Sequence, residues 1–267
     1  MVRLSLSRAW DETKAVLARD GRLFLWVALA LFVLPGVILN VSVPEARAGQ
    51  LPSPGVWVAI GLIAIIVSLI GQLSVIRLGM GPHISVGEAI AHGARRLLPY
   101  IAAVLMWIIP FMIVGLFLFE LMGQKSAHPR PGAAFGLLLL TALGFYIAVR
   151  LLLASAVASA EGRGPVAILQ RSWALSKGNW WRLFAFLLLF GIGAFVLLIA
   201  VQSVMTLIAQ MMLGGIGPLS LGGLVVAIVS QLVSASISVV FFVMIARIYV
   251  QLAAVGEVQP TVPSSGT

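Results

Sequence analysis

Residues 183–212 read LFAFLLLFGIGAFVLLIAVQSVMTLIAQMM, an apolar run that contains no charged residue. About 20 apolar residues cross the hydrocarbon core of a bilayer as a helix, so this run is longer than one crossing requires. A helix of this length must tilt, protrude or break. The run therefore predicts a membrane-spanning helix and an all-α fold whose main solvent is lipid.

The composition extends this prediction to the whole sequence. Of the 267 residues, 61% are hydrophobic and only 9% are charged, whereas a soluble globular domain carries about 25% charged residues. We predict one membrane domain over residues 1–256, a polytopic helix bundle with about six transmembrane helices, and a disordered polar tail at residues 257–267. The runs expected to span the membrane are residues 23–41, 55–79, 99–121, 133–159, 181–212 and 220–250.

Several features should interrupt or delimit these helices. Pro35 and Pro110 lie inside apolar runs, where a proline removes a backbone hydrogen bond and kinks a helix. The segment GGIGP at residues 214–218 predicts a break between the fifth and sixth spans. The first run follows a lead that contains three acidic residues. A cleaved signal peptide would have a purely basic lead, so we expect this run to be a retained span.

The placement of positive charge predicts the topology. With the N-terminus inside, only Arg47, Lys125 and Arg130 of the 17 Lys and Arg residues fall on the outer side, which leaves 14 on the cytoplasmic side. This bias predicts cytoplasmic N- and C-termini in a bacterial inner membrane. The net charge of +9 is spread between the apolar runs. It indicates attraction to anionic lipid headgroups as the partners, and no binding of nucleic acid.

A short amphipathic segment precedes each outward span. One lies around Trp10, one begins with the capping-box pattern from Ser85 to Glu88, and one begins at Pro165. Helices of this kind lie in the plane of the membrane interface, with aromatic rings at headgroup depth. We therefore predict three short cytoplasmic interfacial helices.

Arginines mark the two ends of each predicted pair of spans. The intervals are 55 residues (22 to 77), 54 residues (96 to 150) and 65 residues (182 to 247). This regularity predicts a threefold internal repeat, in which one two-span unit occurs three times with the same orientation.

The arginines that end the returning spans are the candidate binding residues. Arg150 and Arg247 are followed by further apolar residues, so their charges are costly unless they snorkel or find partners. They could serve as topology anchors, or Arg77, Arg150 and Arg247 could converge and bind an anionic group such as a lipid phosphate. The residues expected to anchor the helices at the interface are Trp10, Trp173, Trp180, Trp181, Arg22, Arg96 and Arg182.

The sequence offers no recognisable catalytic site. It contains no Cys, which excludes disulfides, thiolate nucleophiles and cysteine-ligated metals, and only three His. It has no HExxH spacing, glycine-rich phosphate loop or paired carboxylates. We expect no metal, no cofactor and no enzymatic activity. Glu120, near the outer end of a span, is expected to face the interface rather than to relay protons.

One segment has a more individual pattern: residues 161–182 read EGRGPVAILQRSWALSKGNWWR. The pattern resembles the membrane-domain family associated with bacterial glycerophosphodiester phosphodiesterases. In that family the hydrolase is a separate soluble domain with a metal site of Glu, Asp and His, and this sequence contains no such domain. The resemblance therefore implies a multi-pass inner-membrane protein and does not by itself imply an activity. The matching residues are Glu161, Pro165, Ser172, Trp173, Lys177, Gly178, Asn179, Trp181 and Arg182.

The function expected from the sequence is non-enzymatic. The leading hypothesis is a membrane protein that organises, senses or accommodates lipids or serves as a scaffold for a partner protein. The alternative is a small transporter or lipid translocator with a path between the repeats. A polar cavity lined by Gln72, Gln202 or Gln231 would favour transport, and a packed bundle with interfacial grooves would favour the scaffold.

Overall fold

The computed structural model describes residues 4–42, 55–81, 84–121, 131–212 and 220–254. Several predictions concern residues outside these ranges: the break at residues 214–218, the tail at residues 257–267, and the outer-side cations Arg47, Lys125 and Arg130.

The described residues form helices and no strand, which confirms the prediction of an all-α membrane protein. Six helical stretches are long and apolar enough to cross a membrane, as the apolar runs predict. The helices, with the π-helical stretch η1, are α1 (Leu6–Ala28), η1 (Leu29–Val33), α2 (Leu34–Ser42), α4 (Val56–Gly79), α5 (Val86–Leu121), α6 (Pro131–Arg150), α7 (Ala154–Ala160), α8 (Pro165–Ser176), α9 (Trp180–Met212) and α10 (Leu221–Ala253).

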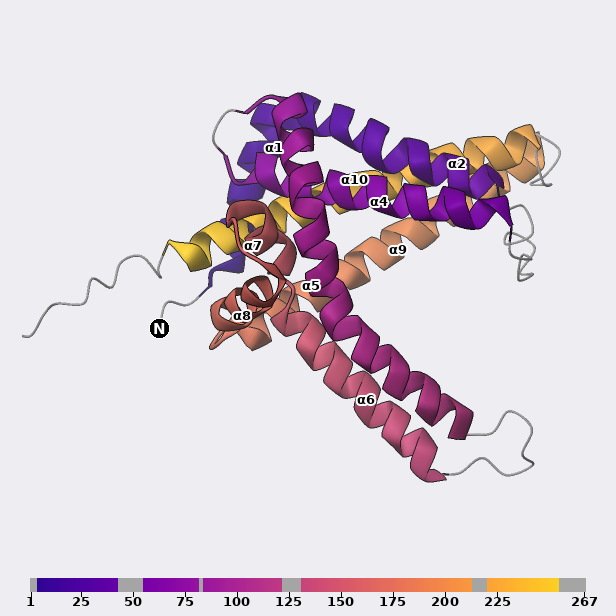
Figure 1. The fold of residues 1–267 in the computed structure, drawn as a ribbon. Coiled ribbons are helices and arrows are strands. Elements are labelled where there is room, and N and C mark those ends of the chain that lie inside the picture. The colour runs from indigo at the N-terminus through magenta and orange to yellow at the C-terminus, as the bar shows by residue number, and fades with distance from the viewer. Residues whose placement is uncertain (1–3, 43–54, 82–83, 122–130, 213–219, 255–267) are drawn as a thin grey trace, which may run out of the picture.

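The helices separate into two groups that diverge (Figure 1). The hairpin of α5 and α6 runs away from the group formed by α2, α4, α9 and α10. The two groups meet where α7 and α8 lie, and we call this the basal end of the bundle; the opposite end is the distal end. Near the basal end α5 packs closely on α4, because Gly93 lets the backbone carbonyl of Ile70 approach. Beyond Ala103, α5 has no buried residue.

The amphipathic segments differ from the prediction of three separate interfacial helices. Residues 6–22 and 86–98 continue without interruption into the spans that follow, as parts of α1 and α5. Only the segment that begins at Pro165 is a helix of its own, α8, because Gly178 adopts a positive φ of 82° and ends it. On α1, Ala9 and Thr13 are fully buried. The inner face of the first segment therefore packs on protein.

Pro35 has a local structural consequence, the π-helical stretch that precedes it. Proline has no backbone N–H, so it cannot donate an α-helical hydrogen bond to the carbonyl of Leu31, four residues earlier. The hydroxyl of Ser68 on α4 donates to this carbonyl at 3.5 Å. Pro110 and also Pro99 lie inside the continuous helix α5.

The predicted fourth span is divided near its basal end. Residues 151–153 form a turn between α6 and α7, and residues 154–159 of α7 are buried. The threefold repeat stays a prediction, because the three returning helices end differently: α4 ends two residues after Arg77, α6 ends at Arg150, and α10 continues six residues past Arg247.

Candidate functional site

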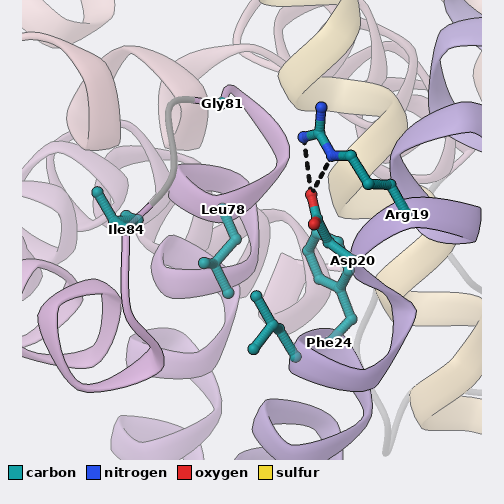
Figure 2. A pocket seen from close by; sticks show the side chains of 7 residues that line it. Arg19, Asp20, Phe24, Leu78, Gly81 and Ile84 are labelled. Carbon is teal, nitrogen blue, oxygen red and sulfur yellow. Dashed lines mark hydrogen bonds and ion pairs between the residues drawn. The ribbon is translucent and has the colours of Figure 1, made fainter.

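A small pocket lies near the basal end, between α1 and the residues that follow α4 (Figure 2). Its volume is about 100 Å³, and its lining residues are Arg19, Asp20, Leu23, Phe24, Leu78, Gly81 and Ile84. Arg19 and Asp20 form an ion pair with a separation of 2.7 Å between Nη2 and Oδ2. The other side chains are apolar, so the pocket has a charged side and an apolar floor.

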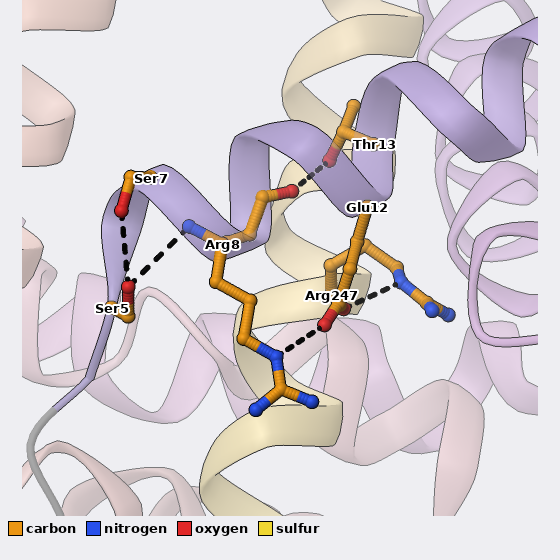
Figure 3. A network of polar contacts seen from close by, with 7 residues as sticks. Ser5, Ser7, Arg8, Glu12, Thr13 and Arg247 are labelled. Carbon is orange, nitrogen blue, oxygen red and sulfur yellow. Dashed lines mark hydrogen bonds and ion pairs between the residues drawn. The ribbon is translucent and has the colours of Figure 1, made fainter.

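Glu12 holds two arginines at the basal end (Figure 3). Arg8 Nε lies 2.9 Å from one carboxylate oxygen, and Arg247 Nε lies 3.1 Å from the other. Arg247 also donates through Nη1 to the carbonyl of Gly79 at 3.3 Å. The guanidinium of Arg247 is therefore engaged within the protein and joins α1, α4 and α10.

Glu161 is the centre of a second network, at the end of the buried α7. Its Oε1 accepts hydrogen bonds from Tyr249 Oη at 2.8 Å and from Arg171 Nε at 3.1 Å, and Arg163 forms an ion pair with Oε2. Burial by itself would raise the pKa of Glu161. The hydrogen bonds from Tyr249 and Arg171 outweigh it, so the pKa of Glu161 lies below its ordinary value.

Arg150 ends α6 among aromatic rings. Its Nε and Nη2 donate to the hydroxyl of Tyr146 at 3.1 and 2.9 Å, and its guanidinium carbon lies 5.2 Å from the ring centroid of Trp173. Such cation–π contacts stabilise a desolvated arginine. The buried Nη1 of Arg150 has no hydrogen-bond partner among the described residues. Arg150 therefore has one buried donor that no described residue satisfies.

Asn179 and Arg182 hold the start of the described chain. The side-chain oxygen of Asn179 accepts from the backbone N–H of Leu4 at 3.1 Å, and Arg182 Nη1 donates to the Leu4 carbonyl. Both polar groups of the Leu4 peptide backbone are thus satisfied, and the Leu4 side chain is buried. Arg182 therefore joins α9 to the start of the described chain, and its role as an interfacial anchor stays a prediction.

The remaining residues of the 161–182 motif are also structural. Pro165 occupies the first turn of α8. Ser172 is fully buried, and its hydroxyl donates to the carbonyl of Arg150 at 3.1 Å, which satisfies a free carbonyl at the end of α6. Lys177 is the C-cap residue of α8, and Trp181 is exposed over 74% of its surface. The motif thus connects α6, α8, α9, α10 and Leu4.

The returning arginines have different partners among the described residues: Arg150 contacts Tyr146, and Arg247 contacts Glu12 and Gly79. A shared anion site of Arg77, Arg150 and Arg247 stays a prediction. Of the predicted anchors, Trp10 and Trp173 are exposed on the surface, as Arg22 is, whereas Trp180 stacks on Phe184. Arg96 lies against Gly162, where an added Cβ would be 2.9 Å from its Nη2.

The polar residues inside the spans are dispersed. Gln72 donates to Tyr100 Oη at 3.2 Å, and Gln202 accepts from Ser230 at 2.6 Å. Gln231 lies directly against Gly36. These contacts couple neighbouring helices. None of the three glutamines lines the pocket of Figure 2 or the apolar groove on α6 that is described below.

His92 also has a structural partner. Its Nε2 donates to the carbonyl of Ser159 at 2.7 Å. In the part of the chain that the structure describes, no three His, Asp or Glu residues gather as they would around a metal ion; the other two histidines, His83 and His128, lie outside it.

A shallow and largely open apolar groove runs along one face of α6, and all its lining residues belong to this helix. Its volume is about 610 Å³, and its lining residues are Ala134, Leu137, Leu138, Thr141, Ala142 and Phe145. From Ala134 to Phe145 the helix rises about 16 Å, close to the depth of one leaflet, which is half of a hydrocarbon core of about 30 Å. We call it the α6 groove. Arg150 lies about one turn beyond its basal end.

The sequence named Arg150 and Glu161 but not their partners. Tyr146 lies one helical turn before Arg150, a spacing that could have indicated the contact. Tyr249 is 88 residues from Glu161, and Glu12 is 235 residues from Arg247. Nothing in the local sequence signals these two pairings.

Comparison with known proteins identifies the family. A family model described as the membrane domain of glycerophosphoryl diester phosphodiesterase matches residues 129–264, about half of the chain. No curated protein and no solved structure matches. The matched residues include α6 to α10, and with them the whole 161–182 motif, so the resemblance inferred from that motif is confirmed. The chain belongs to the family of the membrane domain of glycerophosphoryl diester phosphodiesterase.

Proposed function

We propose that this chain is a non-enzymatic inner-membrane protein that accommodates a membrane lipid, with the acyl chain in the α6 groove and an anionic headgroup beside Arg150. The observation that carries the proposal is the α6 groove itself. It is apolar, and it extends over about the depth of one leaflet.

The chemistry of the basal end supports an anionic headgroup. A phosphate oxygen accepts strong charge-assisted hydrogen bonds from arginine, and Arg150 is one of the cations at this end of the bundle. Trp173 and Tyr146 flank it, and aromatic residues of this kind prefer the headgroup level of a membrane. The proposal requires the Arg150 side chain to change rotamer, so that the buried Nη1 reaches a phosphate.

The orientation belongs to the same proposal. With the basal end in the cytoplasm, the N-terminus, α8 and the C-terminal end of α10 face the side that carries most of the cations. Reporter fusions after residues 121 and 254 test this orientation: the fusion at residue 121 should be active outside the cytoplasm and the fusion at residue 254 inside it.

The experiment for lipid binding compares three arginine variants. Arg150→Gln should reduce the phosphatidylglycerol or cardiolipin that copurifies with the full chain, because it removes the free donor and the charge. Arg247→Gln is the matched control, since Arg247 is engaged by Glu12 and Gly79. Arg77→Gln completes the series. Mass spectrometry of the retained lipids gives the readout, and equal retention in all three variants would contradict the proposal.

The transporter alternative has less support. It requires a polar path, and Gln72, Gln202 and Gln231 engage different neighbours. Uptake of a fluorescent lipid or solute into vesicles that contain the purified protein would favour transport over accommodation.

A further inference from the structure

The pocket of Figure 2 has an unusual combination of groups for a membrane surface. One cation and one anion, Arg19 and Asp20, lie side by side on α1, and Leu78, Gly81 and Ile84 lie opposite them. Phe24, only 2% exposed, closes the apolar floor. The Asp20 side chain is 23% exposed and that of Arg19 is 56% exposed, so both groups remain accessible.

The depth of the pocket restricts its ligand. Leu23 and Phe24 begin the apolar run of the first span, and Leu78 stands at the end of α4, where the second span finishes. The pocket is therefore at the level where two helices pass through the membrane interface, which is the level of lipid headgroups. An added Cβ at Gly81, whose φ is +75°, would meet no atom of the described residues outside its chain neighbours within 4 Å.

The charges restrict the ligand further. A purely anionic group would meet the Asp20 carboxylate, and a purely cationic group would meet the Arg19 guanidinium. A group with both a phosphate and a primary ammonium can replace the internal ion pair with two external ones, phosphate to Arg19 and ammonium to Asp20. The volume of about 100 Å³ is several times the 10–15 Å³ that one water needs on the same measure.

We propose that this pocket binds a phosphoethanolamine group at the membrane interface, with Arg19 contacting the phosphate and Asp20 the ammonium. The source that fits the depth of the pocket is a phosphatidylethanolamine headgroup, and a soluble phosphodiester with the same group is the competing source. This site extends the proposed lipid-accommodating function to a second lipid class, and it does not depend on the Arg150 site.

The test measures lipid preference directly. The full chain, purified in detergent and freed of lipid, is titrated with phosphatidylethanolamine and with phosphatidylglycerol, and bound lipid is counted by native mass spectrometry. We expect tighter binding of phosphatidylethanolamine, and Asp20→Asn should weaken it about tenfold, the effect of one lost charge-assisted hydrogen bond. Arg19→Gln should weaken it similarly.

The control is a matched charge change on the same helix. Asp11 pairs with Lys14 on the exposed face of α1, so Asp11→Asn removes one carboxylate without touching the pocket and should leave the preference unchanged. Equal losses in Asp20→Asn and Asp11→Asn, or no preference in the unmodified chain, would overturn the proposal.

Two further arms separate the sources and the sites. Glycerophosphoethanolamine at a concentration equal to that of the lipid should not displace it, because it lacks the acyl chains; displacement at equal concentration would overturn the lipid assignment in favour of a soluble ligand. Arg150→Gln should lower retention of phosphatidylglycerol and leave the phosphatidylethanolamine preference intact. Failure of the Arg150 site and failure of the Asp20 site therefore give different results.

Discussion

The carboxylate of Glu12 on α1 lies 3.1 Å from Nε of Arg247 on α10, although 235 positions separate the two residues in the sequence. Their side chains are 23% and 20% exposed, so water screens the pair less than it screens a surface ion pair. The contact joins opposite ends of the chain at the basal end of the bundle.

Glu12→Gln should lower the thermal stability of the protein. The variant leaves Arg247 with the carbonyl of Gly79 and without its ionic partner, a loss of about 1–2 kcal/mol. Unfolding of the detergent-solubilised protein, followed by tryptophan fluorescence, measures the change. Asp11→Asn, which breaks the exposed pair with Lys14, should have almost no effect. A larger loss in Asp11→Asn than in Glu12→Gln would contradict the structural role of the pair.

Stability should fall in acid because of Glu161. Its pKa in the folded protein lies below the ordinary value of 4.5, so the unfolded chain takes up the proton first as the pH falls. The stabilisation is fully present above pH 4.5 and is lost as the pH falls through the lower pKa of the folded state. Glu161→Gln should unfold at a lower temperature at pH 7 and lose less stability on acidification. Thermal unfolding measured at a series of pH values from 7 downward checks both effects.

Release of Leu4 can be detected by thiol labelling, because the chain contains no Cys. In Leu4→Cys the new thiol is buried and should react slowly with a maleimide. Adding Asn179→Ala removes the acceptor for the Leu4 N–H and should accelerate labelling several-fold, since local opening becomes easier. Adding Lys177→Ala, at an exposed position, should not. Equal rates in both double variants would show that Asn179 does not restrain the segment.

Gly93 and Gly87 on α5 provide a matched test of helix packing. A Cβ at Gly93 would lie 2.8 Å from the backbone oxygen of Ile70, whereas a Cβ at Gly87 would meet nothing within 4 Å. Gly93→Ala should therefore destabilise the protein by about 1–3 kcal/mol because α5 and α4 must separate. Gly87→Ala should be neutral or stabilising, because alanine favours helix more than glycine does. Comparable unfolding temperatures for the two variants would rule out the close contact.

Local features of the sequence were sufficient to predict the class of fold. The length of the apolar runs predicted six candidate spans. A segment that crosses lipid must satisfy its backbone hydrogen bonds within itself, and a helix does so. The 161–182 motif predicted the family because its signals are also local. Its proline, its glycine and its Lys-Gly-Asn stop act within one or two helical turns.

The sequence alone was less informative about how the helices begin and what their polar groups contact. An amphipathic pattern at residues 6–22 or 86–98 is the same whether the helix stops or continues into a span, so two of the three predicted interfacial helices are extensions of α1 and α5. Spacing along the chain likewise could not predict that Glu12 is the partner of Arg247, because side-chain partners depend on distances across the bundle.

Taken by itself, the sequence determined that this chain spans a membrane, which of its segments are helical and which family it resembles. These properties are local, because hydrophobicity, charge and turn residues act on neighbours along the chain. Only the tertiary structure decided that Glu161 meets Tyr249, that Glu12 meets Arg247 and that Arg19 and Asp20 border a pocket with Leu78. These contacts join residues from helices that packing alone brings together, and packing is a property of the whole chain.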